Sequence, residues 1–318
     1  MKSDIHFVFN PSEIAAGTRG ASLGPAAIET AARKYHNTLF SEFPHSVVKD
    51  RNDALDLGLP PDGKAKYIDE YTEVFKNLES EVCRLLKNGK FPLVLSGDHS
   101  SGAATISGCK LAKPNQKLGV VWIDAHADIH SPYTTPSGNI HGMPLAIATG
   151  IDNLDCKINE PSEKTIADWN ALKNSGDIQP KISTDNLIFC GVRDTEQPED
   201  YLLEKHSIKN FKVQEFRQSS AKKIGQEVLA RLADCDWIYV SFDVDGMDPD
   251  ETSYGTGTPV KNGLHPQEAK DLIETLLASG KVGCFEIVEV NPCLDNLCNK
   301  MAEVTFDILE NSVKVLTK

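Results

Sequence analysis

Residues 119–144, GVVWIDAHADIHSPYTTPSGNIHGMP, indicate both the kind of fold and the place of the chemistry. The stretch opens with the small or apolar run 119–123, which is typical of a strand covered on both faces of a sheet. Acidic and imidazole side chains then follow at every second position, as Asp124, His126 and Asp128. If the extended backbone continues, its two-residue period turns all three side chains to one side.

Two interpretations of this pattern compete. Three polar groups that converge at a buried strand end are costly unless something binds them, and a divalent cation is a natural partner. The alternative is that Asp124, His126 and Asp128 cap the strand and bond to loop amides. One D-x-H-x-D pattern does not decide between the two, so the rest of the chain has to be considered.

Length and composition favour an ordinary globular protein. The chain has 318 residues, of which 40% are hydrophobic and 25% charged. No linker, repeat or low-complexity segment divides it, so we expect a single domain over residues 1–318. The net charge of -13 argues against a nucleic-acid partner, which requires a basic face.

The sequence also suggests a compartment. We expect no signal peptide at the N-terminus and no membrane partner, since no apolar run reaches 18 residues. The eight cysteines form no C-x-x-C pair, which favours free thiols in a reducing cytoplasm. Cys293 and Cys298 lie five residues apart, but without a second such pair we do not interpret them as metal ligands.

Strand and helix patterns alternate along the chain, which predicts an α/β fold with a mostly parallel sheet between helices. The expected strands are 5–9, 46–48, 91–95, 119–123, 186–190, 236–242 and 282–290. The expected helices are 25–34, 64–86, one starting near 101, 144–148, 163–172, 198–205, 219–233, 266–278 and 299–317. The glycine-rich segment 17–25 matches no phosphate-binding motif and is interpreted as a plain connection.

Two further expected strands also end in metal-binding residue types. In open parallel sheets the carboxyl ends of the strands are where ligands bind. Six ligands are too many for one open catalytic site but suit two ions that share carboxylates. Because oxygen ligands dominate and no thiolate is present, Mn²⁺ is favoured over structural zinc. Two such ions about 3.5–4 Å apart can activate a water molecule and polarise an electrophile. The predicted ligands are His99, Asp124, His126, Asp128, Asp243 and Asp245.

The motifs that surround these residues resemble those of the ureohydrolases, and of the arginases most closely. They run in the order of that family over about residues 5–315. The resemblance implies a three-layer α/β/α arginase-like fold, two Mn²⁺ per subunit, and a homo-oligomer, either a trimer or a hexamer. The motifs are SGDHS at 96–100, DAHAD at 124–128, SGNIHG at 137–142, SFDVDG at 241–246, GTP at 257–259 and EIVEVNP at 286–292.

The resemblance also implies roles for the ligands. His99 and Asp128 would hold one ion, and His126 and Asp245 the other. The remaining pair of carboxylates, Asp124 and Asp243, would bridge the two ions. By the same resemblance, Asp128 would be a catalytic residue as well as a ligand.

The same resemblance implies a guanidino substrate. His141 would be the proton shuttle, Glu289 would hold the guanidinium group, and Thr258 would lie beside that group. A carboxylate matches a guanidinium in two-pronged geometry, and an imidazole can protonate a leaving amine. Ser137 and Asn139 would contact the α-carboxylate of the substrate. Near its α-amino group would lie Glu196 and Glu199.

The chain departs from the family pattern at a few positions. Ser96 stands where Gly is usual, Glu196 where Asp is usual, and His130 where Asn is usual. The loop 248–257 is one residue longer than is common. An imidazole can donate a hydrogen bond, so we expect His130 to replace Asn as a substrate contact. Glu286, by contrast, is expected to have only a surface or loop partner.

Several functions remain open at this point. The first is hydrolysis of L-arginine to L-ornithine and urea, and the second is hydrolysis of agmatine, guanidinobutyrate or a related guanidino compound. The intact segment 137–139 favours a substrate with an α-carboxylate and so speaks against agmatine. A catalytically inactive metal-binding homologue is disfavoured because all six ligands are present, and a metal-dependent deacetylase leaves Glu289 without a task.

Overall fold

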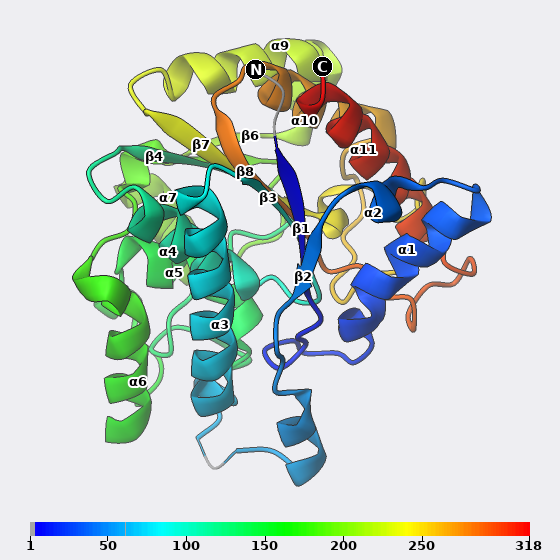
Figure 1. Ribbon diagram of the computed structural model, residues 1–318. Coiled ribbons are helices and arrows are strands. Elements are labelled where there is room, and N and C mark those ends of the chain that lie inside the picture. Colours follow the sequence, from blue (N-terminus) through cyan, green and yellow to red (C-terminus); the bar gives the residue numbers. More distant parts are fainter. Residues whose placement is uncertain (1–3, 61) are drawn as a thin grey trace.

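A single parallel sheet forms the centre of the molecule in the computed structural model, which describes residues 4–60 and 62–318 (Figure 1). Within these residues the sheet has eight strands in the order β2-β1-β3-β8-β7-β4-β5-β6. Every pairing is parallel. The strands are β1 Ile5–Asn10, β2 His45–Val47, β3 Phe91–Ser96, β4 Leu118–Ile123, β5 Leu187–Cys190, β6 Lys209–Phe211, β7 Trp237–Asp243 and β8 Val282–Val288.

Helices cover both faces of the sheet (Figure 1). One layer holds α3 to α7, and the other holds α1, α2 and α8 to α11. This arrangement confirms the expected three-layer α/β/α fold. No helix of the described residues is long and apolar enough to cross a membrane. The helices are α1 Gly24–Lys34, α2 Leu39–Glu42, α3 Ile68–Lys87, α4 Ser101–Ala112, α5 Pro144–Thr149, α6 Glu163–Lys173, α7 Gln197–Lys205, α8 Val213–Gln218, α9 Ala221–Arg231, α10 Pro266–Ala278 and α11 Lys300–Leu316.

Strand β4 shows why the sheet is buried on both sides. Its side chains alternate between the two helical layers, with Val120 and Trp122 on the side of α3 to α7. Val121 and Ile123 point to the other layer. Because both sets are apolar, each face of the strand packs against helices, as the continuous apolar run predicted.

The structure differs from the expected elements mainly at their ends. Helix α3 begins at Ile68 because Tyr67 has a left-handed backbone with φ 58°. Strand β8 ends at Val288, two residues before the predicted end, because Glu289 has φ 67° and cannot continue the ladder. Strand β6, of three residues, and the short helices α2 and α8 were not predicted.

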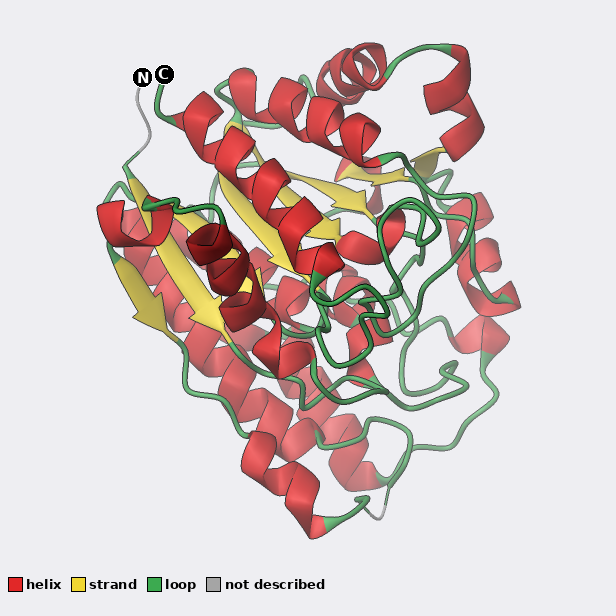
Figure 2. Cartoon of the chain, turned by 90° about the vertical axis from the view of Figure 1, so that its right-hand side faces the viewer, coloured by secondary structure: helices red, strands yellow, loops and turns green. Residues whose placement is uncertain are grey.

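The strand order determines where a ligand site can lie. Strands β3, β8, β7 and β4 are neighbours in the middle of the sheet, and all point the same way. Their carboxyl ends therefore meet at one edge. Figure 2 shows the strand arrowheads directed toward a region of loops. All six predicted ligands end or follow three of these strands, β3, β4 and β7.

Candidate metal centre

The imidazole of His99 lies among three carboxylates at this edge. Its Nδ1 atom is 2.9 Å from Asp124 Oδ2, 3.1 Å from Asp128 Oδ2 and 3.1 Å from Asp243 Oδ2. All four residues are buried. The loops after β3 and β4 and the last residue of β7 therefore supply one compact group of possible ligands.

A second group adjoins the first. His126 Nδ1 lies 3.1 Å from Asp245 Oδ2 and 3.6 Å from Asp124 Oδ1. Asp124 thus turns one oxygen toward each imidazole and stands between the two groups, as a bridging ligand would. The structure brings all six predicted ligands together.

The backbone route to this convergence differs from the one that the sequence suggested. Strand β4 ends at Ile123, so a two-residue strand period does not extend to Asp128. Instead the chain bends after Asp124, and Asp128 has a left-handed backbone with φ 47°. The loop geometry aims the third side chain back at His99.

The residues fit divalent cations. His99 Nδ1 and Asp124 Oδ2 are buried and have no hydrogen-bond partner, although they are close to each other. Such atoms are costly to bury unless a ligand satisfies them. The ligand set is two imidazole nitrogens and four carboxylates, without sulfur, which suits oxygen-preferring transition metals such as manganese.

Neighbouring groups hold the ligands in place. The His99 ring stacks on Trp122, with centroids 3.9 Å apart and planes 5° apart. Asp245 accepts hydrogen bonds from Ala125 N at 3.1 Å and from Thr258 Oγ1 at 3.0 Å. These contacts restrict the rotamers of the ligands before any ion binds.

The buried carboxylates of the cluster also favour the binding of cations. Burial, together with the nearby charge of Asp124, raises the pKa of Asp128 to about 6. Burial and the charges of Asp245 and Asp124 raise the pKa of Asp243 well above its usual range. Carboxylates this close cannot all ionise without counter-charge, which bound cations would supply.

His141 and Glu289 form a pair beside the cluster. His141 Nδ1 lies 3.2 Å from Glu289 Oε1, and the same oxygen accepts a hydrogen bond from His99 N at 3.0 Å. Burial disfavours a charged imidazole, but the hydrogen bond to Glu289 and its charge outweigh burial and raise the pKa of His141 to about 9. His141 therefore carries a proton at neutral pH.

A cavity of about 130 Å³ leads from the surface to the cluster. At its mouth, His130 Nε2 lies 2.9 Å from Glu196 Oε2 and 3.6 Å from Glu199 Oε2. Glu289 lies behind His141 and does not line the cavity. The other residues expected at the site all line it: His99, His126, Asp128, His130, Ser137, Asn139, His141, Glu196, Glu199, Asp243, Asp245 and Thr258, with Asp124 buried beneath.

A larger cavity, of about 940 Å³, opens beside β6. None of the groups of possible metal ligands found among the described residues lies in it. Its size alone therefore does not make it the site of chemistry, and the small polar cavity is the better candidate.

Comparison with known proteins agrees with this geometry. The family model described as Arginase family matches residues 3–313. The chain belongs to the arginase family. An arginase of Bacillus subtilis is 32% identical over 321 residues, which cover 98% of each chain. An arginase of Brevibacillus brevis is 33% identical over 93% of each chain. The solved structure of an arginase from Bacillus caldovelox superposes with a TM-score of 0.80 at 31% identity, over 98% of each chain.

Sequence reasoning missed one part of this arginase-family site. The segment expected to be a plain connection lies against the centre, since a Cβ atom at Gly17 would be 2.7 Å from Asn139 Nδ2. Buried Glu13 accepts hydrogen bonds from Gly20 N at 2.6 Å and Ser22 N at 2.9 Å, which closes the loop. Asp98 fastens it to the site through Ala15 N at 3.0 Å. The only signal was that Asp98 precedes the ligand His99.

The expectation for Glu286 is wrong. Its side chain is 0% exposed and lies in the middle of the sheet, not at the surface or against a loop. Its partners are hydroxyl groups of β3 and β7, Ser96 and Tyr239. Both are far away in the sequence, so no local pattern could reveal them.

Proposed function

We propose that this chain is a binuclear manganese hydrolase that cleaves L-arginine to L-ornithine and urea. The observation that carries the proposal is the approach of three carboxylates within 2.9–3.1 Å of His99 Nδ1, with the His141–Glu289 pair alongside. Membership in the arginase family and the arginases among the relatives support the same activity.

The cation ligands divide between the two groups of the cluster. His99 and Asp128 would hold one Mn²⁺, and His126 and Asp245 the other, with the remaining two carboxylates, Asp124 and Asp243, shared. When bound, the two Mn²⁺ ions would supply an activated water molecule as the nucleophile near neutral pH. The other steps depend on the side chains of the protein.

His141 would supply the proton that the leaving amine needs. Because its pKa is raised to about 9, the imidazole is protonated in the resting site and can act as a general acid. Glu289 would attract the substrate guanidinium, since the carboxylate is buried and has His141 as its nearest cation. The positive charge of the bound guanidinium would then share with His141 the task of compensating the Glu289 carboxylate.

The mouth of the cavity is polarised in a way that suits an amino-acid tail. On one side, Glu196 and Glu199 surround His130 Nε2. On the other side, Lys66 Nζ donates a hydrogen bond to Asn139 Oδ1 at 3.1 Å and brings positive charge beside the predicted α-carboxylate contacts. This supports arginine over agmatine, which has no carboxylate. Guanidinobutyrate, which has a carboxylate but no α-amino group, is the alternative.

We also propose a cytoplasmic homo-oligomer, either a trimer or a hexamer. The support for the compartment is that all eight cysteines are free thiols. The assembly rests on the family resemblance, and sedimentation equilibrium of the purified chain tests it.

A substrate panel tests the proposed function. The purified protein is loaded with Mn²⁺, and urea release is measured from L-arginine, agmatine and 4-guanidinobutyrate, with Asp243→Asn as the matched inactive variant. Arginine should have the highest kcat/KM, and Asp243→Asn should retain the fold by circular dichroism while losing activity. A preference for agmatine or guanidinobutyrate would replace the substrate assignment, and full activity in Asp243→Asn would refute the metal centre.

A further inference from the structure

Glu286 is a buried carboxylate whose side-chain partners among the described residues are hydroxyl groups and not cations. It lies on β8 between Val94 of β3 and Ser241 of β7 in the sheet register. Two hydroxyl groups donate to it, Ser96 Oγ at 2.8 Å and Tyr239 Oη at 2.5 Å. Burying an acid in this way is costly, and packing alone does not require one here.

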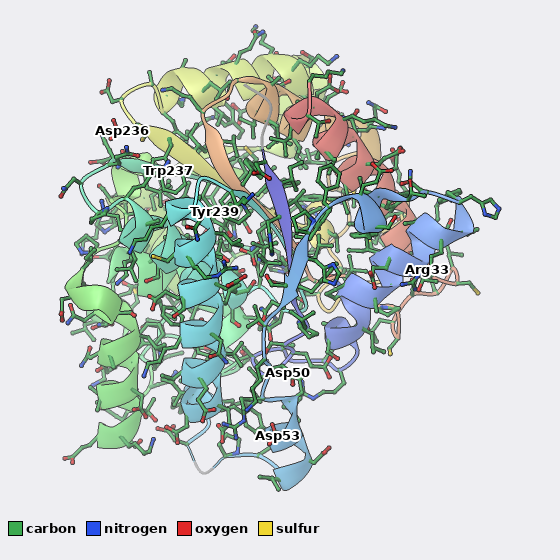
Figure 3. The ribbon with its side chains drawn as sticks, viewed as in Figure 1. Arg33, Asp50, Asp53, Asp236, Trp237 and Tyr239 are labelled. Carbon is green, nitrogen blue, oxygen red and sulfur yellow. The ribbon has the colours of Figure 1, made fainter. Side chains whose placement is uncertain are left out.

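A line of hydroxyl groups connects Glu286 with the metal centre. The Tyr239 phenol donates to Glu286, and Ser241 follows Tyr239 by two residues on β7, so both side chains project from the same face of the sheet. Ser241 Oγ in turn lies 2.8 Å from His99 Nε2. Tyr239 and Ser241 are both 0% exposed, so water does not interrupt this line. Figure 3 labels Tyr239 on β7, near Trp237 at the start of the same strand.

Proton counting gives the line a direction. His99 can bind a cation through Nδ1 only when that atom has no proton, so its remaining ring proton lies on Nε2 and must be donated. Ser241 Oγ is the acceptor at that position, so its own hydrogen must point away from His99, and the Tyr239 side chain lies on the same face of β7. Tyr239 donates its single hydrogen to Glu286 Oε2.

The other oxygen of Glu286, Oε1, also accepts a hydrogen bond. Asn10 Nδ2 donates to Ser96 Oγ at 3.3 Å, which leaves the Ser96 hydrogen free to be donated to Glu286 Oε1. Every hydrogen in the network therefore points toward one acceptor. A neutral or donating group at position 286 would remove the reason for this orientation.

We propose that Glu286 is a positioning residue that orients the Tyr239–Ser241 hydroxyl line, so that His99 presents Nδ1 to a cation. The inference rests on the proposed metal centre and assigns it a support that lies on β7 and β8, behind the His99 ring. Interactions of this kind, one step removed from a ligand, typically change metal affinity about 10- to 100-fold.

The test uses Glu286→Gln and Tyr239→Phe in the full chain. Glu286→Gln keeps the shape but allows the amide to donate, and Tyr239→Phe interrupts the line while keeping the carboxylate. The matched control is Glu79→Gln, since Glu79 is also buried and accepts from two hydroxyl groups, Ser107 Oγ and Ser175 Oγ, in the helical layer. Two quantities are measured: Mn²⁺ affinity against a chelator, and the Nε2–H resonance of His99 in the Zn²⁺-loaded protein.

Both variants should bind the Mn²⁺ that His99 holds about 10- to 100-fold less tightly, and the Nε2–H proton of His99 should exchange faster with water. Glu79→Gln should change neither quantity. Affinity within twofold of the wild type, with an unchanged Nε2–H proton in Tyr239→Phe, would overturn the proposal even if Glu286→Gln fails to fold. If the wild type itself binds no Mn²⁺, the proposed function fails instead, so the two failures are distinguishable.

Discussion

At the scale of single residues, His141 is the side chain on which the proposed proton transfer depends. Replacement by Asn removes the acid and leaves the six cation ligands in place. We expect kcat for arginine to fall about 100-fold or more, with the Mn²⁺ content unchanged. Turnover assays and elemental analysis measure the two quantities, and the exposed His45→Asn serves as control. An unchanged kcat would show that another group protonates the leaving amine.

His130 makes a second prediction at this scale. The structure places its Nε2 atom 2.9 Å from Glu196 Oε2, so the imidazole contacts an acid at the cavity mouth, where a substrate contact was expected. Hydrogen bonds to charged groups are worth about 1.5–3 kcal/mol, or about 10- to 150-fold in kcat/KM.

His130→Ala should therefore raise KM for arginine and leave slow agmatine hydrolysis nearly unchanged, and His130→Asn should restore much of the arginine activity. Steady-state kinetics with both substrates decide. Equal losses for both substrates would indicate that His130 supports the loop or the metal centre.

At the scale of elements, the contact between α4 and β4 fixes the plane of the His99 ring. A Cβ atom at Gly102 would lie 2.6 Å from Trp122 Cη2, the ring on which His99 stacks. Gly→Ala in a helix normally gains about 1 kcal/mol, but here the overlap should reverse the sign and destabilise by about 1–3 kcal/mol.

Urea denaturation of Gly102→Ala measures this difference, with Gly63→Ala as the control because nothing lies within 4 Å of a Cβ atom there. The variant should also lose Mn²⁺ affinity through the displaced His99 ring. A stabilised Gly102→Ala would mean that Trp122 moves aside at little cost.

The elements that sequence predicted well are those with long apolar periodicity, such as β4, β7 and α3. Strand β6 was missed because its three residues, Lys209–Phe211, contain only one apolar side chain. It exists through its pairing with β5, which no local pattern reports. The end of β8 was misplaced for a similar reason, because the left-handed turn at Glu289 depends on contacts with the loop after β3.

At the scale of the whole molecule, stability should depend on pH through Lys181. This lysine is buried, and its ammonium group donates to Lys173 O at 3.0 Å and to Ile178 O. Burial lowers its pKa to about 8 in the folded state, against 10.5 in the unfolded chain. Between pH 8 and 10.5 the unfolded chain therefore binds more protons, so this residue makes stability rise with pH across that window.

Relative to Lys181→Met, the wild type should gain on the order of 1–3 kcal/mol between pH 7.5 and 10.5. Denaturation curves of the two proteins at matched pH values measure the difference in their free energies of unfolding. Taking this difference cancels the contribution of all groups that titrate alike in both proteins. A difference that stays constant with pH would show that the lysine remains fully charged in the folded state.

The site as a whole was predictable to the extent that its residues follow strand ends. The positions of His99, Asp124 and Asp243 follow from one rule about parallel sheets. The network behind them was not predictable, since Glu286 meets Ser96, 190 residues away, and Tyr239, 47 residues away. The partners of Glu286 lie on the neighbouring strands β3 and β7, so the sequence of β8 alone does not show that this residue belongs to the network.

The left-handed backbone of Asp128 and Glu289 has a consequence for the evolution of this chain. Both are ordinary L-residues at φ 47° and φ 67°, a conformation that costs about 1–2 kcal/mol and that glycine adopts freely. Random mutagenesis with selection for thermostability alone would therefore favour glycine at these two positions. The resulting proteins would be more thermostable but would lack both carboxylates. A directed-evolution campaign on this scaffold has to screen for turnover in every round.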